Sequence, residues 1–327
     1  MTHQLSGQTQ TGTARPWYPA ELPPDATEIV VSYNPIAGLR SAEHRVEKLA
    51  ALLRSNGYEA SVYTDLDEAT RKANDAFAAG SLRALVGVGG DGTALELINR
   101  TCAGTPITLL PAGNESLLAR YLGLSASPEA LYQTICAGRL RRLDAGCCSG
   151  RLFALMVSCG FDAQVVHIVH RRRRGHMGTR HYFKPIWETV RSYRFPEIRI
   201  ELEDFHTPGQ INQPLFARWC FVFNLPCYGG GFRICPQASG VDGLLDLCTF
   251  DRGGFWPGLF YAATVAARCH RALKVCNYRR VRRLRISSSE LVYYQIDGDP
   301  GGTLPVEVEI VPDRLTFIVP VDSFQRP

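Results

Sequence analysis

A glycine-rich segment, VGVGGDGTALELINR at residues 86–100, holds the residue types that most directly indicate chemistry in this chain. Gly87, Gly89 and Gly92 have the spacing of a loop that joins a strand to the start of a helix. Glycines at such a junction let the backbone approach a phosphate, while free amides and the helix dipole hold its negative charge. The segment therefore predicts a phosphate-binding loop.

Asp91 lies among these glycines, and its charge limits which phosphate ligand fits. A dinucleotide site places an acidic residue about 20 positions further on to bind the ribose, but the next predicted strand here ends in Pro111, Ala112 and Gly113. A carboxylate beside a pyrophosphate is repulsive unless a cation lies between them or the carboxylate takes a proton. Both conditions belong to phosphoryl transfer, so we expect a nucleotide held with Mg²⁺ and Asp91 as base or metal contact. The alternative is that Asp91 only caps the helix that follows it.

The elements that position this loop alternate between strand and helix. Residues 1–27 are rich in Thr, Gln and Pro and are expected to form a mobile tail. Period-two and helical patterns then alternate as far as the helix predicted over 127–138, with Ser127 as cap and Gly138 past its end. This alternation is typical of a Rossmann-like parallel α/β nucleotide domain, which we place at residues 28–140.

From about Leu140 the pattern changes to short apolar strands separated by turns. Helical windows interrupt them only around residues 180–193 and 258–273. This pattern is typical of an antiparallel β-sandwich, which we place at residues 141–327.

Composition limits the cellular setting. The 327-residue chain has 36 Lys and Arg against 31 Asp and Glu, a net charge of +5 that favours anionic partners. Its 11 Cys include no CxxC pair, and no signal-peptide pattern precedes them, so we expect free thiols in a reducing cytoplasm. Because no apolar run reaches the roughly 18 residues of a membrane span, any membrane contact is expected to be peripheral.

Several ordered motifs resemble the diacylglycerol kinase catalytic-domain family, which includes bacterial lipid kinases and sphingosine kinases. The glycine loop GGDGT (residues 89–93) and YNPIAG (33–38) resemble its first nucleotide motifs, and LPAGNESLLARYLG (110–123) resembles its third motif. The second half adds LDAG (143–146), SCGFDAQV (158–165), a loop resembling the bacterial Mg²⁺ loop (CPQASGVDGLLDL, 235–247) and a hairpin resembling its Asp-Gly-Glu hairpin (QIDGDPGGTLPVEVEIVP, 295–312). NAD kinases and phosphofructokinases carry similar glycine loops, but the third motif and the hairpin fit the lipid kinases better.

The resemblance implies ATP and Mg²⁺ as cofactors and assigns roles to particular residues. Asp91 or Asp299 would take the proton of the acceptor. A structural Mg²⁺ would be held by Asp242 with carbonyls near Ser239 and Leu244, and Asp144 would lie close by. The nucleotide would be contacted by Asn34, Pro35, Gly38, Thr64, Gly89, Gly90, Gly92, Thr93, Glu96, Gly113 and Asn114.

The sequence departs from the family pattern at three places. The family's third motif normally reads Gly-Thr-x-Asn-Asp, whereas here it reads Gly113, Asn114, Glu115, Ser116, Leu117. A hydroxyl therefore becomes an amide at the second position, and an acid becomes apolar at the last. Leu95 replaces an Asn after the glycine loop. The hairpin motif ends in Asp299, one methylene shorter than the family's Glu, which could displace the carboxylate by about 1 Å or require a bridging water.

A basic stretch at residues 167–184 contains five Arg, one Lys and four His. On its own this stretch could be a solvated loop or helix end. Beside a lipid kinase resemblance, it indicates contact with an anionic membrane surface, since basic residues there contribute about 1 kcal/mol each. Nucleic acid is not expected, because no aromatic platform accompanies the charges.

The expected protein is thus a cytoplasmic, membrane-peripheral lipid kinase that transfers the γ-phosphoryl group of ATP to a diacylglycerol- or sphingosine-like acceptor. Two alternatives stay open, an NAD-kinase-type enzyme and a homologue that binds nucleotide or lipid without catalysis. The substitutions at Asn114, Ser116 and Asp299 favour the second alternative, and a homodimer also stays open.

Overall fold

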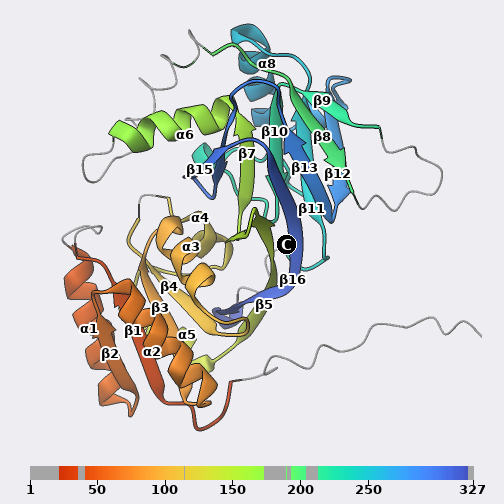
Figure 1. Ribbon diagram of the computed structural model, residues 1–327. Helices are drawn as coiled ribbons and strands as arrows, with labels where there is room; N and C mark the ends of the chain where they lie inside the picture. The colour runs from red at the N-terminus through yellow and green to blue at the C-terminus, as the bar shows by residue number, and fades with distance from the viewer. Residues whose placement is uncertain are drawn as a thin grey trace, which may run out of the picture.

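The computed structural model describes residues 22–35, 41–113, 115–172, 189, 193–203 and 213–322. They form an N-terminal lobe of alternating strands and helices and a C-terminal lobe made mainly of strands (Figure 1). Of the predicted tail, residues 1–21 lie outside this described part, whereas Leu22 packs against the core and Ala26 is buried. The prediction of a tail therefore extends too far at its C-terminal end.

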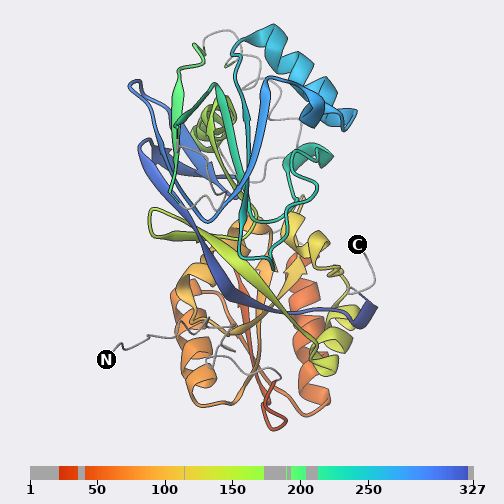
Figure 2. The ribbon, with the colours of Figure 1, turned by 90° about the vertical axis from the view of Figure 1, so that its right-hand side faces the viewer.

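The N-terminal lobe has the predicted parallel sheet, with strand order β2-β1-β3-β4. Helices α1 and α5 pack together on one face and α2 and α3 on the other, as Figure 2 shows. Because both faces are covered, β3 is buried along most of its length. The strands are β1 (Glu28–Tyr33), β2 (Glu59–Tyr63), β3 (Leu82–Gly89) and β4 (Pro106–Pro111). The helices are α1 (Ser41–Ser55), α2 (Leu66–Ala78), α3 (Asp91–Arg100), α4 (Leu117–Tyr121) and α5 (Pro128–Ala137).

The predicted boundaries of α5 are confirmed by its capping. The Ser127 hydroxyl accepts a hydrogen bond from the amide of Ala130 (3.3 Å), and Pro128 occupies the first helical position. Gly138 ends the helix in the left-handed region, with φ of 61°, where a residue without Cβ is favoured.

The chain end returns to the N-terminal lobe, which the sequence did not indicate. Strand β16 (Val306–Ile318) pairs in parallel with β4 and antiparallel with β5 (Leu140–Cys148). Both strands run from one lobe into the other (Figure 2). A single division near residue 140 therefore separates the lobes only approximately. The same sheet continues through β13 (Arg283–Ser287), β8 (Ile198–Leu202) and β9 (Leu215–Ala217), with β6 (Arg151–Phe153) beside β5.

A second, antiparallel sheet completes the C-terminal lobe, as predicted. Its strands, in order, are β12 (Cys276–Val281), β11 (Leu245–Phe250), β10 (Trp219–Phe223), β7 (Met156–Gly160), β14 (Tyr293–Ile296) and β15 (Asp299–Thr303). Helix α8 (Phe255–Ala266) overlaps the helical window predicted around residues 258–273 but begins three residues earlier. The window predicted around residues 180–193 lies mostly outside the described residues.

Helix α6 (Phe161–Arg172) was not predicted. It packs against β14, β15 and β7, with Val165 and Val169 buried one helical turn apart.

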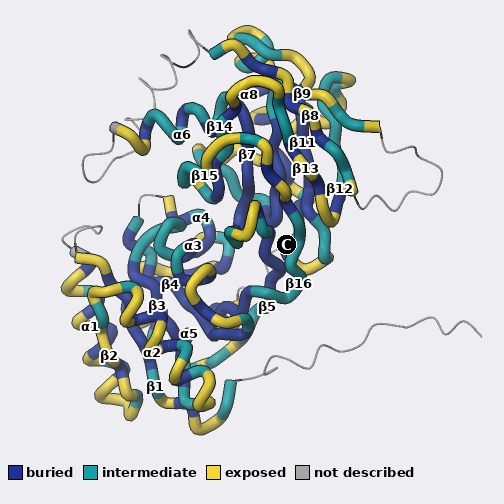
Figure 3. The backbone as a smooth tube through the Cα atoms, viewed as in Figure 1, coloured by how far each residue is buried: buried dark blue, intermediate teal, exposed yellow. Residues whose placement is uncertain are grey.

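Buried residues follow the strands of both lobes, and exposed residues lie mainly on the outer turns and helices (Figure 3). Strand β13 presents one face to solvent, because Arg283 and Arg285 are exposed while Leu284 and Ile286 are buried. Among the described residues, no helix is long and apolar enough to cross a membrane.

Candidate active site

The predicted nucleotide residues gather at the edge of the N-terminal sheet where its parallel strands end. In open α/β sheets this carboxyl edge is where ligands bind. Gly38 and Asn114 lie outside the described residues. The residues at this edge are Asn34 and Pro35 after β1, Thr64 after β2, Gly90 after β3 and Gly113 after β4.

The glycines of this edge are required by close approach of neighbouring groups. A Cβ on Gly89 would overlap the side chain of Thr93, and a Cβ on Gly113 would lie 2.8 Å from the Cα of Gly90. The amide of Ala112 donates to the Gly89 carbonyl at 2.9 Å. The backbones of the glycine loop and of the third motif are therefore in direct contact at this edge.

Asp91 is the first residue of α3, but its carboxylate caps a different helix. Its oxygens accept hydrogen bonds from the amides of Leu117 and Leu118, both at 2.9 Å, at the N-terminus of α4. Burial raises the pKa of Asp91, while these two amides act in the opposite direction. Asp91 thus joins the glycine loop to the third motif. The alternative that Asp91 caps the helix that follows it is wrong, because α3 has no side-chain cap and Asp91 caps α4.

Asp299, at the start of β15, brings a carboxylate from the C-terminal lobe to the glycine loop. Its Oδ2 lies 3.7 Å from the position that a Cβ on Gly92 would occupy. A side chain on Gly92 would therefore narrow the space between the two lobes. The Asp299 side chain is 30% exposed.

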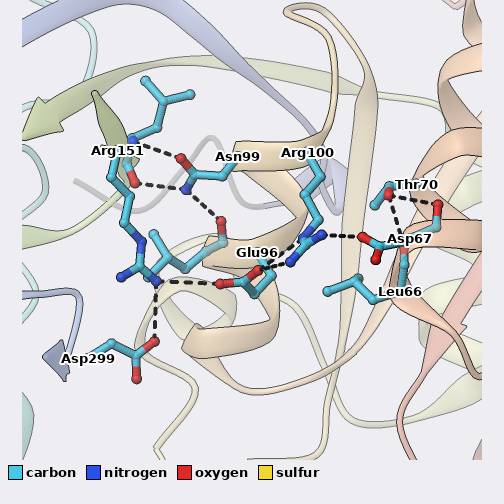
Figure 4. Close-up of polar contacts among 10 residues, drawn as sticks. Leu66, Asp67, Thr70, Glu96, Asn99, Arg100, Arg151 and Asp299 are labelled. Carbon is cyan, nitrogen blue, oxygen red and sulfur yellow. Dashed lines mark hydrogen bonds and ion pairs between the residues drawn. The ribbon is translucent and has the colours of Figure 1, made fainter. Parts of the chain in front are cut away.

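Arg151, which sequence reasoning did not identify, links this carboxylate to α3. Its guanidinium lies 3.8 Å from Oδ2 of Asp299 and 3.5 Å from Oε1 of Glu96 (Figure 4). Glu96 also pairs with Arg100 at 2.9 Å. The Glu96 carboxylate is therefore engaged by two arginines in this structure, although it was predicted to contact the nucleotide.

Asn99 holds the β5–β6 turn against α3 and so places Arg151. Its side chain accepts from the amide of Leu152 (2.8 Å) and donates to the carbonyl of the same residue (3.0 Å). Figure 4 shows this pair beside the Arg151 and Glu96 contact. No local pattern marks Asn99 or Arg151, because their partners lie far away in the sequence.

Asp297, two residues before Asp299, anchors the hairpin and was also missed. Its carboxylate accepts hydrogen bonds from the amides of Ala154 (2.8 Å), Leu155 (2.9 Å) and Met156 (2.8 Å). Burial raises the pKa of Asp297 to about 7; the three amides oppose that rise, and the charge of Asp91 adds to it. Asp91, Asp297 and Asp299 therefore meet where the lobes face each other.

A buried polar network supports the hairpin from the other side. Gln295 accepts from the amide of Gly298 (2.7 Å) and donates to the hydroxyl of Ser158 (2.9 Å). Ser158 in turn donates to Asp162, which also accepts from the hydroxyl of Tyr228 at 2.5 Å. This network fixes the turn between Asp297 and Asp299. Asp162 belongs to the SCGFDAQV motif. The sequence therefore marked this residue, but it did not indicate that the Asp162 carboxylate supports the hairpin.

Two of the predicted metal residues, Asp144 and Asp242, line one open cavity of about 720 Å³, and protein groups engage both carboxylates. Asp144 is buried and accepts from the amides of Gly243 (2.8 Å) and Asp313 (2.7 Å). Burial raises its pKa, and the two amides lower it.

Asp242, in the same cavity, accepts from the amide of Leu244 (3.1 Å) and pairs with Arg280. Ser239 immediately precedes Gly240, whose carbonyl accepts from the Asp144 amide at 2.6 Å. Mg²⁺ usually keeps several waters and binds the protein through one or two carboxylates. Among the described residues, no three His, Cys, Asp or Glu side chains are placed to hold a metal ion. Arg280 supplies positive charge beside Asp242 in this arrangement, and the Mg²⁺ site at this loop stays a prediction.

A second cavity, of about 400 Å³, opens beside the third motif and is lined by Gly113, Glu115, Ser116 and Arg120 among others. The Ser116 hydroxyl is buried without a hydrogen-bond partner among the described residues and lies close to Gly113. Glu115 reaches the C-terminal lobe, where its Oε1 accepts weakly from the amide of Gly230 at 3.4 Å. The altered third motif is therefore part of the space between the lobes.

Comparisons with known proteins agree with this arrangement. Residues 28–148 match the diacylglycerol kinase catalytic domain, and residues 155–319 match the YegS C-terminal NAD kinase beta sandwich-like domain. A diacylglycerol kinase of Bacillus subtilis (strain 168) is 24% identical over 304 residues, which cover 90% of this chain and 97% of the relative. A diacylglycerol kinase of Mycobacterium tuberculosis (strain ATCC 25618 / H37Rv) is 27% identical over 297 residues, covering 88% and 93%.

Solved structures show the same fold. A diacylglycerol kinase from Bacillus anthracis str. Sterne superposes with a TM-score of 0.63 at 16% identity, covering 91% of this chain and 98% of that one. An NAD kinase from Archaeoglobus fulgidus in complex with ATP superposes with a TM-score of 0.52 at 15% identity, covering 91% and 96%. The two matched domains together span nearly all of the described chain, and this chain therefore belongs to the diacylglycerol kinase catalytic-domain family, with a YegS-type C-terminal domain.

Proposed function

We propose that this protein is an ATP-dependent lipid kinase that transfers the γ-phosphoryl group to a lipid hydroxyl, with a diacylglycerol- or sphingosine-like acceptor. One observation carries the proposal. The Asp299 carboxylate of the second lobe faces Gly92 of the glycine loop, 3.7 Å from the position of a Cβ there. A phosphate bound at the loop and a hydroxyl bound beside the hairpin would then be neighbours, as phosphoryl transfer requires.

In this proposal the glycine loop holds the phosphates through backbone amides and the N-terminus of α3. Mg²⁺ accompanies ATP and neutralises the developing charge on the transferred group. Asp299 takes the proton of the acceptor hydroxyl, because both oxygens of Asp91 and of Asp297 already accept backbone hydrogen bonds. Arg151 and the Gln295 network orient Asp299.

The test is an assay with γ-labelled ATP, Mg²⁺ and separate acceptors, namely diacylglycerol, sphingosine and NAD. The parent chain is expected to label a lipid, and Asp299→Ala to lose more than about 100-fold of that rate, as expected for a positioned base. Asp75→Ala, an exposed aspartate on α2, serves as the matched control and should keep the parental rate. Loss of lipid labelling in the control as well would remove the assignment of Asp299.

The NAD arm tests the second candidate. The fold likeness to an NAD kinase is the observation that favours it. Labelling of NAD alone would replace the lipid kinase proposal. ATP binding without labelling of any acceptor would instead favour the interpretation that this homologue has lost catalysis.

A further inference from the structure

Helix α8 exposes a group of large apolar side chains at the outer end of the C-terminal lobe. Phe255 is 39% exposed, Trp256 74%, Leu259 54% and Phe260 51%. The helix lies at the end of the molecule remote from α1 and α5 (Figure 1), and Figure 3 shows exposed segments there. Its sequence, FWPGLFYAATVA, contains no charged residue. An apolar group of this kind on a surface marks an interaction site.

The inner face of α8 is fixed, so the apolar outer face cannot turn inward. A Cβ on Gly258 would lie 3.1 Å from the Trp219 ring, which shows how closely the helix approaches β10. Tyr261 stacks on Phe250 of β11 with 4.4 Å between ring centroids, and Val265 is buried on the same face. Rotating the helix would lose these contacts. Exposure of Trp256 and its neighbours is thus a stable property of the fold.

The charged residues of the sequence segment that contains this helix have one sign. From Arg252 to Ser289 the sequence contains nine Lys or Arg and no Asp or Glu. Arg252 precedes the helix, Arg268 and Arg271 follow it, and all three are exposed. Asp251, the acid next to this segment, accepts a hydrogen bond from the side-chain amide of Asn277 at 3.0 Å. The apolar face is therefore bordered by cations.

We propose that α8 is an interfacial anchor that inserts its apolar face into the headgroup boundary of an anionic bilayer. Trp and Phe are the side chains that favour this boundary, and basic residues beside them add attraction to anionic lipids. A face about 18 Å long, at 1.5 Å per residue, suits a helix lying in the plane of the membrane. An exposed Trp with no acidic neighbour on its helix fits a lipid surface better than a polar protein partner.

This inference rests on the proposed function, because an enzyme whose acceptor lies in a bilayer has to reach the membrane. It places the membrane contact on α8, whereas the sequence predicted that contact at the basic stretch, residues 167–184. Of that stretch, residues 173–184 lie outside the described residues. Contacts also lead from α8 toward the hairpin network. Trp219 packs against Phe161, with 5.2 Å between ring centroids, and Phe161 directly precedes Asp162.

The experiment measures co-sedimentation with vesicles of phosphatidylcholine containing or lacking phosphatidylglycerol, without nucleotide. The parent chain is compared with the triple variant Trp256→Ser, Leu259→Ser, Phe260→Ser. The matched control is Leu291→Ser, which removes an apolar side chain that is 70% exposed but lies outside α8. We expect the triple variant to bind anionic vesicles at least tenfold more weakly, and the control to bind like the parent. Thermal unfolding of each chain checks that it is folded.

A second measurement stays informative if the triple variant does not fold. Adding anionic vesicles is expected to shift the tryptophan emission of the parent chain to the blue, and brominated lipid is expected to quench that emission. Trp256→Phe in the full chain is expected to remove both effects. Equal vesicle binding by parent and triple variant, or no spectral change attributable to Trp256, would overturn the proposal. So would a dimer that forms through this face and leaves the chain unable to bind vesicles, because the occupant would then be a second copy.

The outcome is separable from that of the proposed function. Phosphorylation of a detergent-dispersed acceptor should be equal in the parent and in the triple variant. Vesicle binding with no kinase activity would refute the proposed function alone, whereas kinase activity with no vesicle binding would refute the anchor alone.

Discussion

Replacing Asp297 by Asn should change how the stability of the fold depends on pH. The carboxylate of Asp297 accepts three backbone hydrogen bonds at the hairpin, and burial raises its pKa to about 7. An aspartate in an unfolded chain has a pKa of about 3.9. Between these values the folded chain binds the proton more tightly than the unfolded chain does. Protonation of Asp297 therefore stabilises the fold at low pH, and this contribution is lost as the pH rises through about 7.

The magnitude follows from the two pKa values. Integrated between pH 5 and pH 8, a group with a pKa of about 7 in the fold and about 3.9 in the unfolded chain changes the free energy of unfolding by about 3 kcal/mol. Asn does not titrate, so Asp297→Asn lacks this change. From pH 5 to pH 8, the free energy of unfolding of the variant relative to that of the parent should therefore rise by about 3 kcal/mol. For a chain of this size this corresponds to roughly 5 °C in relative melting temperature.

The assay is thermal and urea unfolding of both chains at pH 5, 6, 7 and 8. Other titrating groups, including Asp246, whose pKa burial raises to about 6, are common to both chains and cancel in the difference. Asp75→Asn, an exposed position on α2, is the control and should follow the parent at every pH. A constant difference between Asp297→Asn and the parent would refute the reasoning, because it would mean that the three amides keep the carboxylate ionised throughout.

Further predictions concern transfer and membrane binding. Asp299→Glu is expected to keep or raise the rate of phosphoryl transfer where Asp299→Ala abolishes it; equal rates for both would place the proton transfer elsewhere. Asp91→Asn, which removes one of the two acceptors that cap α4, should lower the melting temperature while the transfer rate per folded molecule falls far less than in Asp299→Ala; a loss of more than about 100-fold per folded molecule would place Asp91 in the proton transfer. Gln295→Leu, which releases the Gly298 amide, should lower kcat at unchanged KM for ATP, and an unchanged kcat would contradict a positioning role. Replacing Arg171 to Arg174 by Ser should weaken binding to anionic vesicles most at low salt, since charges are screened beyond about 10 Å at 0.1 M; binding that does not depend on salt in either chain would contradict it.

Local patterns predicted the elements well where a single stretch determines them. The parallel order of the N-terminal lobe, the caps of α5 and the alternating face of β13 all follow from residues close together in the sequence. Helix α6 was missed because Val165, Val166, Ile168 and Val169 favour a strand by their branching, whereas packing on β14 and β7 selects the helix.

The site was predictable as a set of motifs but not as a set of contacts. Asp91 was expected to face a ligand or cap α3, yet it caps α4, a five-residue helix whose preceding residue Ser116 has a positive φ of 44°. No short sequence pattern predicts a helix of only five residues. Arg151 was missed because its partners, Glu96 and Asp299, come from the two lobes, and only the folded chain brings them together.

The paired strands β5 and β16 have a mechanical consequence for the protein. Two lobes joined by one flexible linker could swing freely, but here the connection is a paired ribbon that resists bending. Its pairing is interrupted between Val311 and Leu315, where Asp313 adopts a φ of 52° and donates its amide to Asp144. Such an interruption is where a ribbon bends most easily. We therefore expect the lobes to open and close about this point, with Asp144 setting its stiffness, and Asp144→Asn to speed amide hydrogen exchange at residues 311–315.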